Sequence, residues 1–216
     1  MLDKASKDVS NFLKGKGLPN VILKGQGIAK LYPKPEFRMA GDVDVLLTSP
    51  GSYTKDGEYS INRSVLEIKK KLEQTKKGKL GKVVYHHIDW QLPGFEVEVH
   101  VRPMQFNDPW VNARFQRWSR DFLRGELKPV DTQADCGFPV PSAEFNLVDL
   151  MVHIYHHFLF EGVGLRQVCD YAVMLQNSSC QNKTEIVDTL KSFKMERFSR
   201  GMMWVMKEVF SLPEEC

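Results

Sequence analysis

Short apolar runs alternate with segments of helical spacing in the first part of the chain. Apolar side chains recur every three or four residues over 2–13, which predicts a helix, and the segment 14–17 with its two glycines ends it. The apolar run at 21–23 predicts a short buried strand, and residues 28–32 predict a short helix. Residues 42–47 predict the next strand, so helices and strands are mixed here.

Alternating polar and apolar residues indicate a hairpin in the middle of the chain. Composition predicts a loop over 49–62, and the apolar residues of 65–72 are spaced as one face of a helix. Residues 82–90 and 94–102 then alternate on either side of Leu92-Pro93-Gly94, which predicts a β-hairpin. One face of the second strand is apolar, and its other face carries Glu96, Glu98, His100 and Arg102.

Helical spacing dominates the last part of the chain, after a segment rich in proline between residues 126 and 142. Ser142 is a good N-cap, and Glu144 lies in the first turn, where the helix dipole favours it. The pattern predicts four helices, over 142–160, 164–177, 183–193 and 196–210.

These elements predict an α+β fold, in which a small mixed sheet flanked by helices is followed by a C-terminal helical domain. We place the α/β domain at residues 1–128 and the helical domain at residues 129–216. The chain ends at Cys216 shortly after an apolar helix, and one interpretation is that the helical domain is truncated there.

Composition narrows the class of protein but does not name a function. The 216 residues are 42% hydrophobic and 26% charged, as in an ordinary soluble globular protein. No apolar run reaches the roughly 18 residues of a membrane span, and the N-terminal MLDKASKDVSNF is too charged for a signal peptide. We therefore expect a cytoplasmic protein without a membrane partner. The cysteines lack the close spacing of zinc or redox motifs.

Positive charge is concentrated in one segment. The net charge of +3 is too small to indicate nucleic-acid binding by itself. Residues 69–79 nevertheless hold six lysines and one acidic residue. A solvated surface explains such a run, and a contact with nucleic-acid phosphates is the alternative. The run has no aromatic residues that could stack on bases, so nucleic acid is an optional partner rather than a required one.

Two aspartates in a predicted strand are the first candidates for chemistry. Asp42 and Asp44 stand two residues apart, so their carboxylates share one face, with Cα atoms about 7 Å apart. Like charges this close are costly unless a cation lies between them, and Mg²⁺ is held by carboxylates together with substrate phosphates. Glu98 is a third candidate, and Glu96 shares its face. A solvent-exposed strand face would explain each carboxylate equally well.

A glycine-containing turn precedes the aspartates. Lys24-Gly25-Gln26-Gly27 joins a predicted strand to a predicted helix. Glycines let the backbone approach an anion, and a helix N-terminus offers free N–H groups to phosphate. A tight turn without a ligand is the alternative, and the segment is not a Walker A loop. A glycine turn, an Asp-x-Asp strand and a later strand carboxylate together fit metal-assisted phosphoryl or nucleotidyl transfer.

These motifs resemble those of the DNA polymerase beta-like nucleotidyltransferase superfamily. The matching stretches are LKGQGIAKLYPKPEFRMAGDVDVLL at 23–47 and EVEVHVRP at 96–103. More narrowly, the chain is similar to an uncharacterised bacterial nucleotidyltransferase family with the pattern LKG, Tyr-Pro, Arg, Gly-Asp-x-Asp and then Glu-x-His. Residues 141–175 are similar to the helical half of that family, and the stretches together cover about half the chain in the right order.

The resemblance implies a three-carboxylate catalytic and metal-binding site. Asp42 and Asp44 would be metal ligands, and Glu98 would be the third carboxylate. Glu96 stays open as an alternative, because it lies two residues away on the same face. We favour Glu98, because Glu98 and His100 match the Glu-x-His pattern of the family. His100 is also predicted to bind the nucleotide.

The glycine turn is where the chain departs from the superfamily. Lys24, Gly25 and Gln26 occupy the position of a Gly-Ser or Gly-Gly turn, so a serine hydroxyl that could bind phosphate is missing. Lys24 and Arg38 are candidates to supply positive charge instead. Lys24, Gly25, Gln26 and Arg38 are all predicted to bind the nucleotide.

The first helix of the helical half carries a polar stripe, and polar groups on a buried helix need partners. His153 and His157 are four residues apart, so His153 is either a hydrogen-bonded structural residue, part of a nucleotide-binding cleft or a metal ligand. In the next helix, Arg166 and Asp170 would either pair on the helix surface or anchor the helical half near the site. The stripe consists of Asn146, Asp149, His153, His156 and His157.

The predicted function is metal-dependent transfer of a nucleoside monophosphate from a nucleoside triphosphate, with ATP as the expected donor and Mg²⁺ or Mn²⁺ as the ion. The acceptor hydroxyl could belong to a small molecule, a protein or an RNA end, and pyrophosphate would be released. The main alternative is an inactive module of the same fold that binds a nucleotide or nucleic acid. Kinase-like phosphoryl transfer is a third hypothesis, because such a metal site does not choose the phosphorus that is attacked.

Overall fold

The computed structural model describes the chain as two compact units. The described residues are 2–38, 41–48, 52–53, 59–125, 137–177 and 183–213. A sheet unit contains the described residues up to Pro103, except 31–33, together with 137–140. A helical unit contains residues 31–33, 104–125 and the described residues from Pro141 onward. The predicted α+β class is confirmed.

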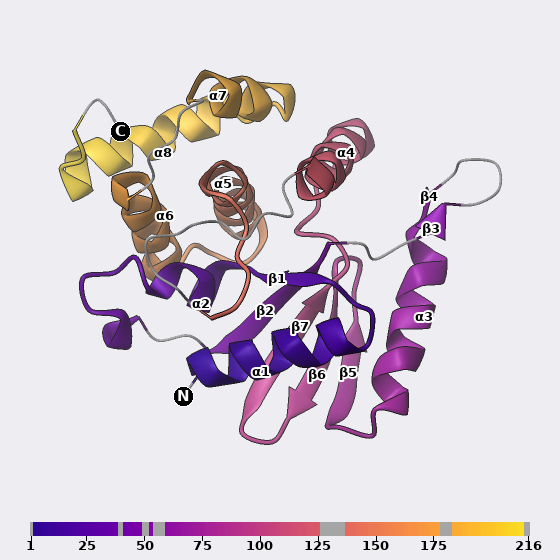
Figure 1. Cartoon of the computed structure of the whole chain (residues 1–216). Coiled ribbons are helices and arrows are strands. Elements are labelled where there is room, and N and C mark those ends of the chain that lie inside the picture. The colour runs from indigo at the N-terminus through magenta and orange to yellow at the C-terminus, as the bar shows by residue number, and fades with distance from the viewer. Residues whose placement is uncertain are drawn as a thin grey trace. The chain divides into compact units, whose positions relative to one another are not determined.

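A mixed five-stranded sheet forms the centre of the sheet unit (Figure 1). Its order is β1-β2-β7-β6-β5, and only the β2–β7 pair is parallel. The parallel pair joins segments that are about 50 residues apart in sequence. The strands are β1 (Asn20–Ile22), β2 (Asp42–Leu47), β5 (Lys79–Val83), β6 (His87–Leu92) and β7 (Phe95–His100).

One face of this sheet is apolar and is covered by two helices. The helices α1 (Leu2–Gly15) and α3 (Ile61–Gln74) contribute Val9, Leu13 and Leu72 to the same buried core as the valines of β2 and β7. Each such side chain, when fully buried, contributes about 1.5–3 kcal/mol. The alternation predicted for β2 and β7 therefore explains which face the helices cover.

The other face of the sheet gathers polar side chains. Since alternate residues share a face, register places Asp44 opposite Glu98 across the parallel pair, and Glu98 opposite Asp89 across the β6–β7 pair. His100 lies opposite His87 in the same way. One face thus holds the core and the other the candidate chemistry.

Where the sequence predicts a two-stranded hairpin, the structure has three consecutive antiparallel strands, β5, β6 and β7. The segment predicted as a single arm over 82–90 contains the ends of two strands, β5 and β6, and a turn at 84–86. Within that turn the Val84 N–H donates to the His87 carbonyl oxygen at 3.0 Å. The turn has neither glycine nor proline, so the usual sequence signal is missing. The second turn is as predicted, with Gly94 at φ 89°.

Four further elements differ from the prediction. The helix expected over 28–32 is α2 (Lys24–Ala29), so the glycines lie inside its first turns rather than before it. A 3₁₀ turn, η1, spans Pro35–Phe37. Two-residue strands β3 (Ser52–Tyr53) and β4 (Tyr59–Ser60) pair within the segment expected to be loop, while 54–58 lie outside the described residues.

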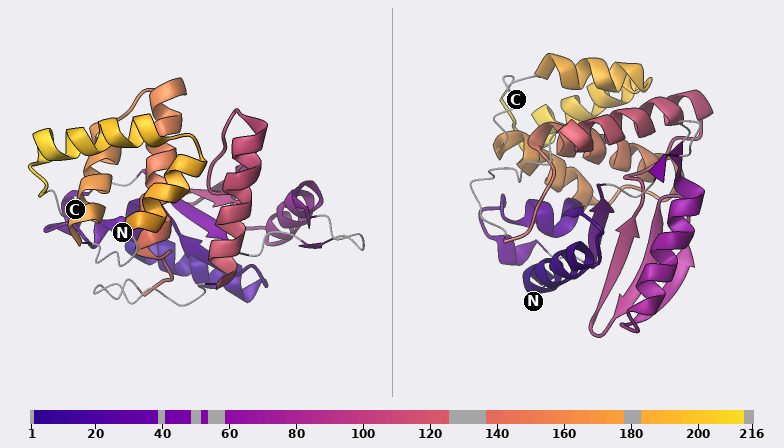
Figure 2. Two further views of the ribbon diagram at one scale, coloured as in Figure 1. Left: turned by 90° about the horizontal axis from the view of Figure 1, so that it is seen from above. Right: turned by 45° about the vertical axis from the view of Figure 1, so that its right-hand side comes forward.

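The helical unit confirms the four predicted helices and adds a fifth (Figure 2). Ser142 caps α5, because its hydroxyl accepts a hydrogen bond from the Phe145 N–H at 3.4 Å. The predicted helices are α5 (Ala143–Phe160), α6 (Leu165–Asn177), α7 (Lys183–Ser192) and α8 (Glu196–Phe210).

The additional helix, α4 (Pro109–Gly125), belongs to the helical unit. Asp108 caps it by accepting hydrogen bonds from the N–H groups of Trp110 and Val111 at 2.9 and 3.1 Å. Asp108 followed by Pro109 is a recognisable helix start, so this element was readable from the sequence. The predicted domain boundary at 128/129 lies outside the described residues.

Aromatic side chains fill the interior of the helical unit. The ring of Trp118 on α4 stacks on that of Phe145 on α5, with centroids 5.2 Å apart and an angle of 9° between the planes. The rings of Phe115 and Phe193 meet edge to face at 5.5 Å. Such pairs add about 0.5–1.5 kcal/mol to the burial of the rings. Among the described helices, none has the length and apolar character needed to cross a membrane.

Candidate active site

Two neighbouring strands bring the three predicted carboxylates together. Asp42 and Asp44 lie on β2, and Glu98 lies on β7 opposite Asp44. One carboxylate oxygen from each of the three lies within 4.8 Å of the others. Glu96 faces Asp42 in register, but its exposed side chain accepts a hydrogen bond from Gln91 Nε2 at 3.0 Å. The geometry therefore brings Glu98, rather than Glu96, into this group.

Lys24 and His100 contact the carboxylates directly. Lys24 Nζ lies 3.0 Å from Asp44 Oδ1, and both side chains are nearly buried. His100 Nε2 lies 3.0 Å from the same oxygen and 3.2 Å from Glu98 Oε2. His100 is only 1% exposed, so it occupies the interior of the site. These contacts place positive charge against two of the three carboxylates.

The two aspartates have opposite electrostatic environments. Burial raises the pKa of Asp42 to about 6, and the neighbouring charges of Asp44 and Glu98 add to that increase. Burial would also raise the pKa of Asp44, but the Lys24 ammonium and the hydrogen bond from His100 outweigh it and hold that pKa well below its usual range. Asp44 is therefore ionised at neutral pH. For Asp42, burial and the two neighbouring carboxylates outweigh the attraction of Lys24.

Glu98 and His100 stabilise each other's charged forms. Burial opposes ionisation of Glu98, but the hydrogen bond from His100 lowers the pKa of Glu98 overall. For His100, burial lowers the pKa, and the hydrogen bonds to Asp44 and Glu98 raise it above its usual value. The site thus balances clustered carboxylates with the cations of its own side chains.

The donor set fits a divalent cation with hard oxygen preference. Three carboxylates can each offer an oxygen atom to one ion, which is the chemistry that Mg²⁺ and Mn²⁺ select. The raised pKa of Asp42 also favours a bound cation, because a cation would relieve the repulsion among the carboxylates of Asp42, Asp44 and Glu98. Asp42, Asp44 and Glu98 are the residues that could hold such an ion.

The segment between β1 and β2, which contains α2 and η1, holds the other residues predicted to bind phosphate. Lys24 has a positive φ of 39°, which is rare for a residue with a side chain, and strained backbone clusters at functional sites. Gly25 departs from helical geometry at φ 19° and ψ −105°, and Gln26 is buried. A Cβ atom on Gly27 would lie 2.8 Å from the Ile22 carbonyl oxygen, so this position requires glycine. Arg38 lies half-buried at the end of η1.

Three residues next to the carboxylates were not singled out from the sequence. They are His86, in the turn before β6, and His87 and Asp89, on β6. His87 Nδ1 lies 3.5 Å from Glu98 Oε2, and burial lowers the pKa of His86 to about 3. The register of a hairpin with its turn at Pro93-Gly94 would have placed His87 opposite His100.

His153 lies in the helical unit and pairs with a second histidine. Its Nε2 is 3.0 Å from that of His157, and His157 Nδ1 is 3.0 Å from Glu161 Oε2. The predicted role of His153 in nucleotide binding stays a prediction. In α6, the buried Asp170 accepts a hydrogen bond from the Tyr32 hydroxyl at 2.6 Å. Asp170 thus connects α6 to the segment 31–33 within this unit.

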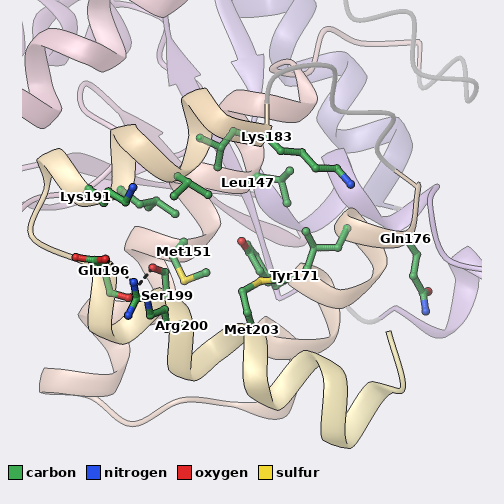
Figure 3. A pocket seen from close by; sticks show the side chains of 14 residues that line it. Leu147, Met151, Tyr171, Gln176, Lys183, Lys191, Glu196, Ser199, Arg200 and Met203 are labelled. Atoms are coloured by element: carbon green, nitrogen blue, oxygen red, sulfur yellow. Dashed lines mark hydrogen bonds and ion pairs between the residues drawn. The ribbon is translucent and has the colours of Figure 1, made fainter. Parts of the chain in front are cut away.

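The helical unit also contains a cavity of about 620 Å³ (Figure 3). Helices α5 to α8 surround it, and buried Leu147, Met151 and Tyr171 form part of its lining. Arg200 and Glu196, paired at 2.8 Å, lie at one end of it. None of the residues predicted to bind metal or nucleotide lines this cavity.

Comparison with known proteins gives one matching family, and the solved structures that are similar to the chain include the two remote ones described below. A family model described as "Uncharacterised nucleotidyltransferase" matches residues 1–211. No curated protein matches the chain. The antibiotic-resistance factor ANT(2'')-Ia is similar at 13% identity and a TM-score of 0.48, with 92% of each chain covered. An antigenic nucleotidyltransferase-like protein from Paracoccidioides brasiliensis is similar at 15% identity and a TM-score of 0.45, over 94% of this chain and 92% of that one.

Proposed function

Because the chain belongs to the family of uncharacterised nucleotidyltransferases, we propose that it transfers a nucleoside monophosphate from a nucleoside triphosphate to an acceptor hydroxyl group. Pyrophosphate is the second product. The donor is ATP, the ion is Mg²⁺ or Mn²⁺, and the reaction takes place in the cytoplasm. The observation that carries this proposal is the meeting of Asp42, Asp44 and Glu98 from β2 and β7.

The three carboxylates have a common role in the proposed reaction. Asp42, Asp44 and Glu98 would bind the divalent ion, which supplies positive charge to the phosphates and to the developing negative charge of the transition state. A carboxylate oxygen that is not engaged with the ion is suited to accept the proton of the acceptor hydroxyl. The burial of these groups strengthens each electrostatic interaction that they make.

The cationic side chains around the carboxylates bind and orient the nucleotide. Lys24 carries an ammonium group within the site, and the backbone N–H groups near Gly25 and Gln26 belong to the first turn of α2. Both kinds of donor suit phosphate oxygens. Arg38 would provide a second cation. His100 holds Asp44 and Glu98 in place through its Nε2 atom.

Product analysis with ATP labelled at two positions tests the proposal. ATP labelled at the α-phosphorus should yield a labelled acceptor when the protein, Mg²⁺ and pools of small molecules, proteins or RNA are combined. ATP labelled at the γ-phosphorus should yield labelled pyrophosphate. A labelled acceptor from the γ-position would instead establish kinase-like phosphoryl transfer.

The alternative is a nucleotide-binding or nucleic-acid-binding module without turnover. Gln26 favours it, since a glutamine stands where the superfamily has a serine or glycine, and the side chain is buried rather than open to a phosphate. Calorimetric titration with ATP and Mg²⁺, followed by a pyrophosphate-release assay, separates the two. Binding without release supports the module, and binding with release supports the enzyme.

A further inference from the structure

Beside the three carboxylates lies a second group of metal-ligating side chains. His87 on β6 faces His100 on β7 in the antiparallel register. Glu98 Oε2 is 3.5 Å from His87 Nδ1 and 3.2 Å from His100 Nε2. One ligand atom from each of the three residues lies within 4.8 Å of the others. We propose that His87, Glu98 and His100 bind a transition-metal ion, of which Zn²⁺ is the best match.

The chemistry of the donors distinguishes this group from its neighbour. Two imidazoles and one carboxylate form a ligand set typical of Zn²⁺, and imidazole also suits other late transition metals. Mg²⁺ prefers oxygen atoms alone, which Asp42, Asp44 and Glu98 provide. Glu98 belongs to both groups, and this shared residue is the only link between the proposed Zn²⁺ site and the proposed function. Zn²⁺ binding itself needs neither nucleotide nor turnover.

Asp89 holds the His87 ring in the orientation that a metal ligand needs. Its Oδ1 atom lies 2.9 Å from His87 Nε2. A hydrogen bond from that N–H to the carboxylate leaves Nδ1 with a free lone pair on the side of Glu98. Histidines that bind metals almost always donate their other ring N–H in this way, and the partner fixes both tautomer and ring orientation.

Hydrogen bonding among the site residues does not account for His87 Nδ1. In the ion-free protein a proton on His100 Nε2 explains the contacts of that ring, because both Asp44 and Glu98 can accept from it. Zn²⁺ would displace this proton when it binds, because a histidine ligand must be deprotonated. His87 Nδ1, in contrast, is a buried atom with no hydrogen-bond partner within the described part of the chain. It faces a carboxylate oxygen, which is also an acceptor. A cation between these two facing acceptors would relieve their repulsion.

Two substitutions separate the two groups. His87→Ala removes one imidazole and leaves all three carboxylates, whereas Asp42→Asn removes one carboxylate and leaves the histidine group intact. We expect His87→Ala to weaken Zn²⁺ binding by more than about tenfold and to leave Mg²⁺ binding unchanged. Asp42→Asn should do the reverse. His86→Ala is the matched control, since its ring lies 4.5 Å from that of His87 but is not part of the group.

The experiment is a calorimetric titration of the chelator-treated full chain with Zn²⁺ and separately with Mg²⁺, without nucleotide. Titration with Co²⁺ adds a spectroscopic readout, because nitrogen ligation changes the visible absorption of the ion. The wild-type chain should bind one equivalent of Zn²⁺, and the Co²⁺ spectrum should change in His87→Ala but not in His86→Ala. Circular dichroism checks that each variant is folded.

Asp89→Asn keeps the proposal testable if His87→Ala does not fold. Asp89 is partly exposed, and the substitution retains an oxygen that can accept from His87. Loss of the charge should weaken Zn²⁺ binding by about tenfold. Equal Zn²⁺ affinity in the wild type, His87→Ala and Asp89→Asn would overturn the proposal, as would the absence of Zn²⁺ binding in the wild type. Either outcome leaves Mg²⁺-dependent transfer to be judged by its own assay.

Discussion

Asp44 and Glu98 occupy the same register position of the parallel pair formed by β2 and β7. Both point to the polar face of the sheet, and His100 Nε2 lies 3.0 Å from an oxygen of the first and 3.2 Å from an oxygen of the second. This pairing converts a common sequence pattern, Asp-x-Asp followed by Glu-x-His, into one cluster of charges.

The two glutamates of β7 should differ sharply in their effect on activity. Glu98→Gln removes a member of the carboxylate group, so we expect nucleotidyl transfer to fall by about 100-fold or more. Glu96→Gln is the matched control, because Glu96 is exposed and contacts Gln91. Mg²⁺ titration and pyrophosphate release measure both variants. Equal losses in the two variants would show that Glu98 has no special role.

Asp42 should destabilise the metal-free protein at neutral pH. Burial and like charges raise its pKa to about 6, so the folded state binds a proton that the unfolded state has already lost between pH 4 and 6. The stabilisation from the protonated form is complete below pH 4 and is lost as the pH rises through 6. Asp42→Asn should therefore melt a few degrees higher than the wild type at pH 7.5.

The same comparison at about pH 3 provides the control, because Asp42 is then mostly protonated in both the folded and the unfolded state and the difference in melting temperature should largely vanish. Added Mg²⁺ should raise the melting temperature of the wild type and not that of Asp42→Asn. A variant that melts lower than the wild type at pH 7.5 in a chelating buffer would contradict the assigned repulsion.

Lys24 should be needed for nucleotide binding. Its ammonium lies 3.0 Å from Asp44 Oδ1, at the same distance as His100 Nε2. Lys24→Met should weaken ATP binding by about tenfold, equivalent to about 1.4 kcal/mol. Lys30→Met, at the other end of α2, is the control. Calorimetric titration with ATP and Mg²⁺ measures both, and an unchanged affinity in Lys24→Met would remove Lys24 from the site.

Gly27 should tolerate no side chain. A Cβ atom there would lie 2.8 Å from the Ile22 carbonyl oxygen, which belongs to the backbone of β1 and cannot turn away. Gly27→Ala should lower the free energy of unfolding by about 1–3 kcal/mol. Gly15→Ala, where a Cβ atom would meet nothing within 4 Å, should be neutral or slightly stabilising. Urea denaturation of both variants compares them, and similar stabilities would contradict the close approach.

The strands and helices with strong periodicity were predictable, and so were the polar strand faces that carry the candidate site residues. Alternation in 42–47 and 94–102 assigned Asp42, Asp44, Glu98 and His100 to polar faces, because the valines between them had to be buried. The pairing of strands that are far apart in sequence could not be predicted in this way. That β2 lies beside β7 in parallel, with Asp44 at the level of Glu98, depends on packing of the whole sheet and is not encoded in either strand alone.

The failures also have physical causes. The turn at 84–86 uses Val, Tyr and His, which carry no turn signal, so β5 and β6 merged into one predicted strand and His87 was overlooked. Lys24 adopts a positive φ that the sequence does not indicate, and α2 begins at Lys24, earlier than the predicted start at residue 28. The helix α4 was missed although Asp108-Pro109 signals its start.

Transfer of label from α-labelled ATP by the wild type and by the double variant Asp42→Asn, Asp44→Asn tests the three-carboxylate site most directly. Both proteins are incubated with Mg²⁺ and the same acceptor pools, and circular dichroism confirms that the variant is folded. The wild type should release pyrophosphate and form a labelled product, and the variant should form none. Equal formation of labelled product by the two proteins would contradict the assignment of Asp42 and Asp44 as the catalytic metal ligands.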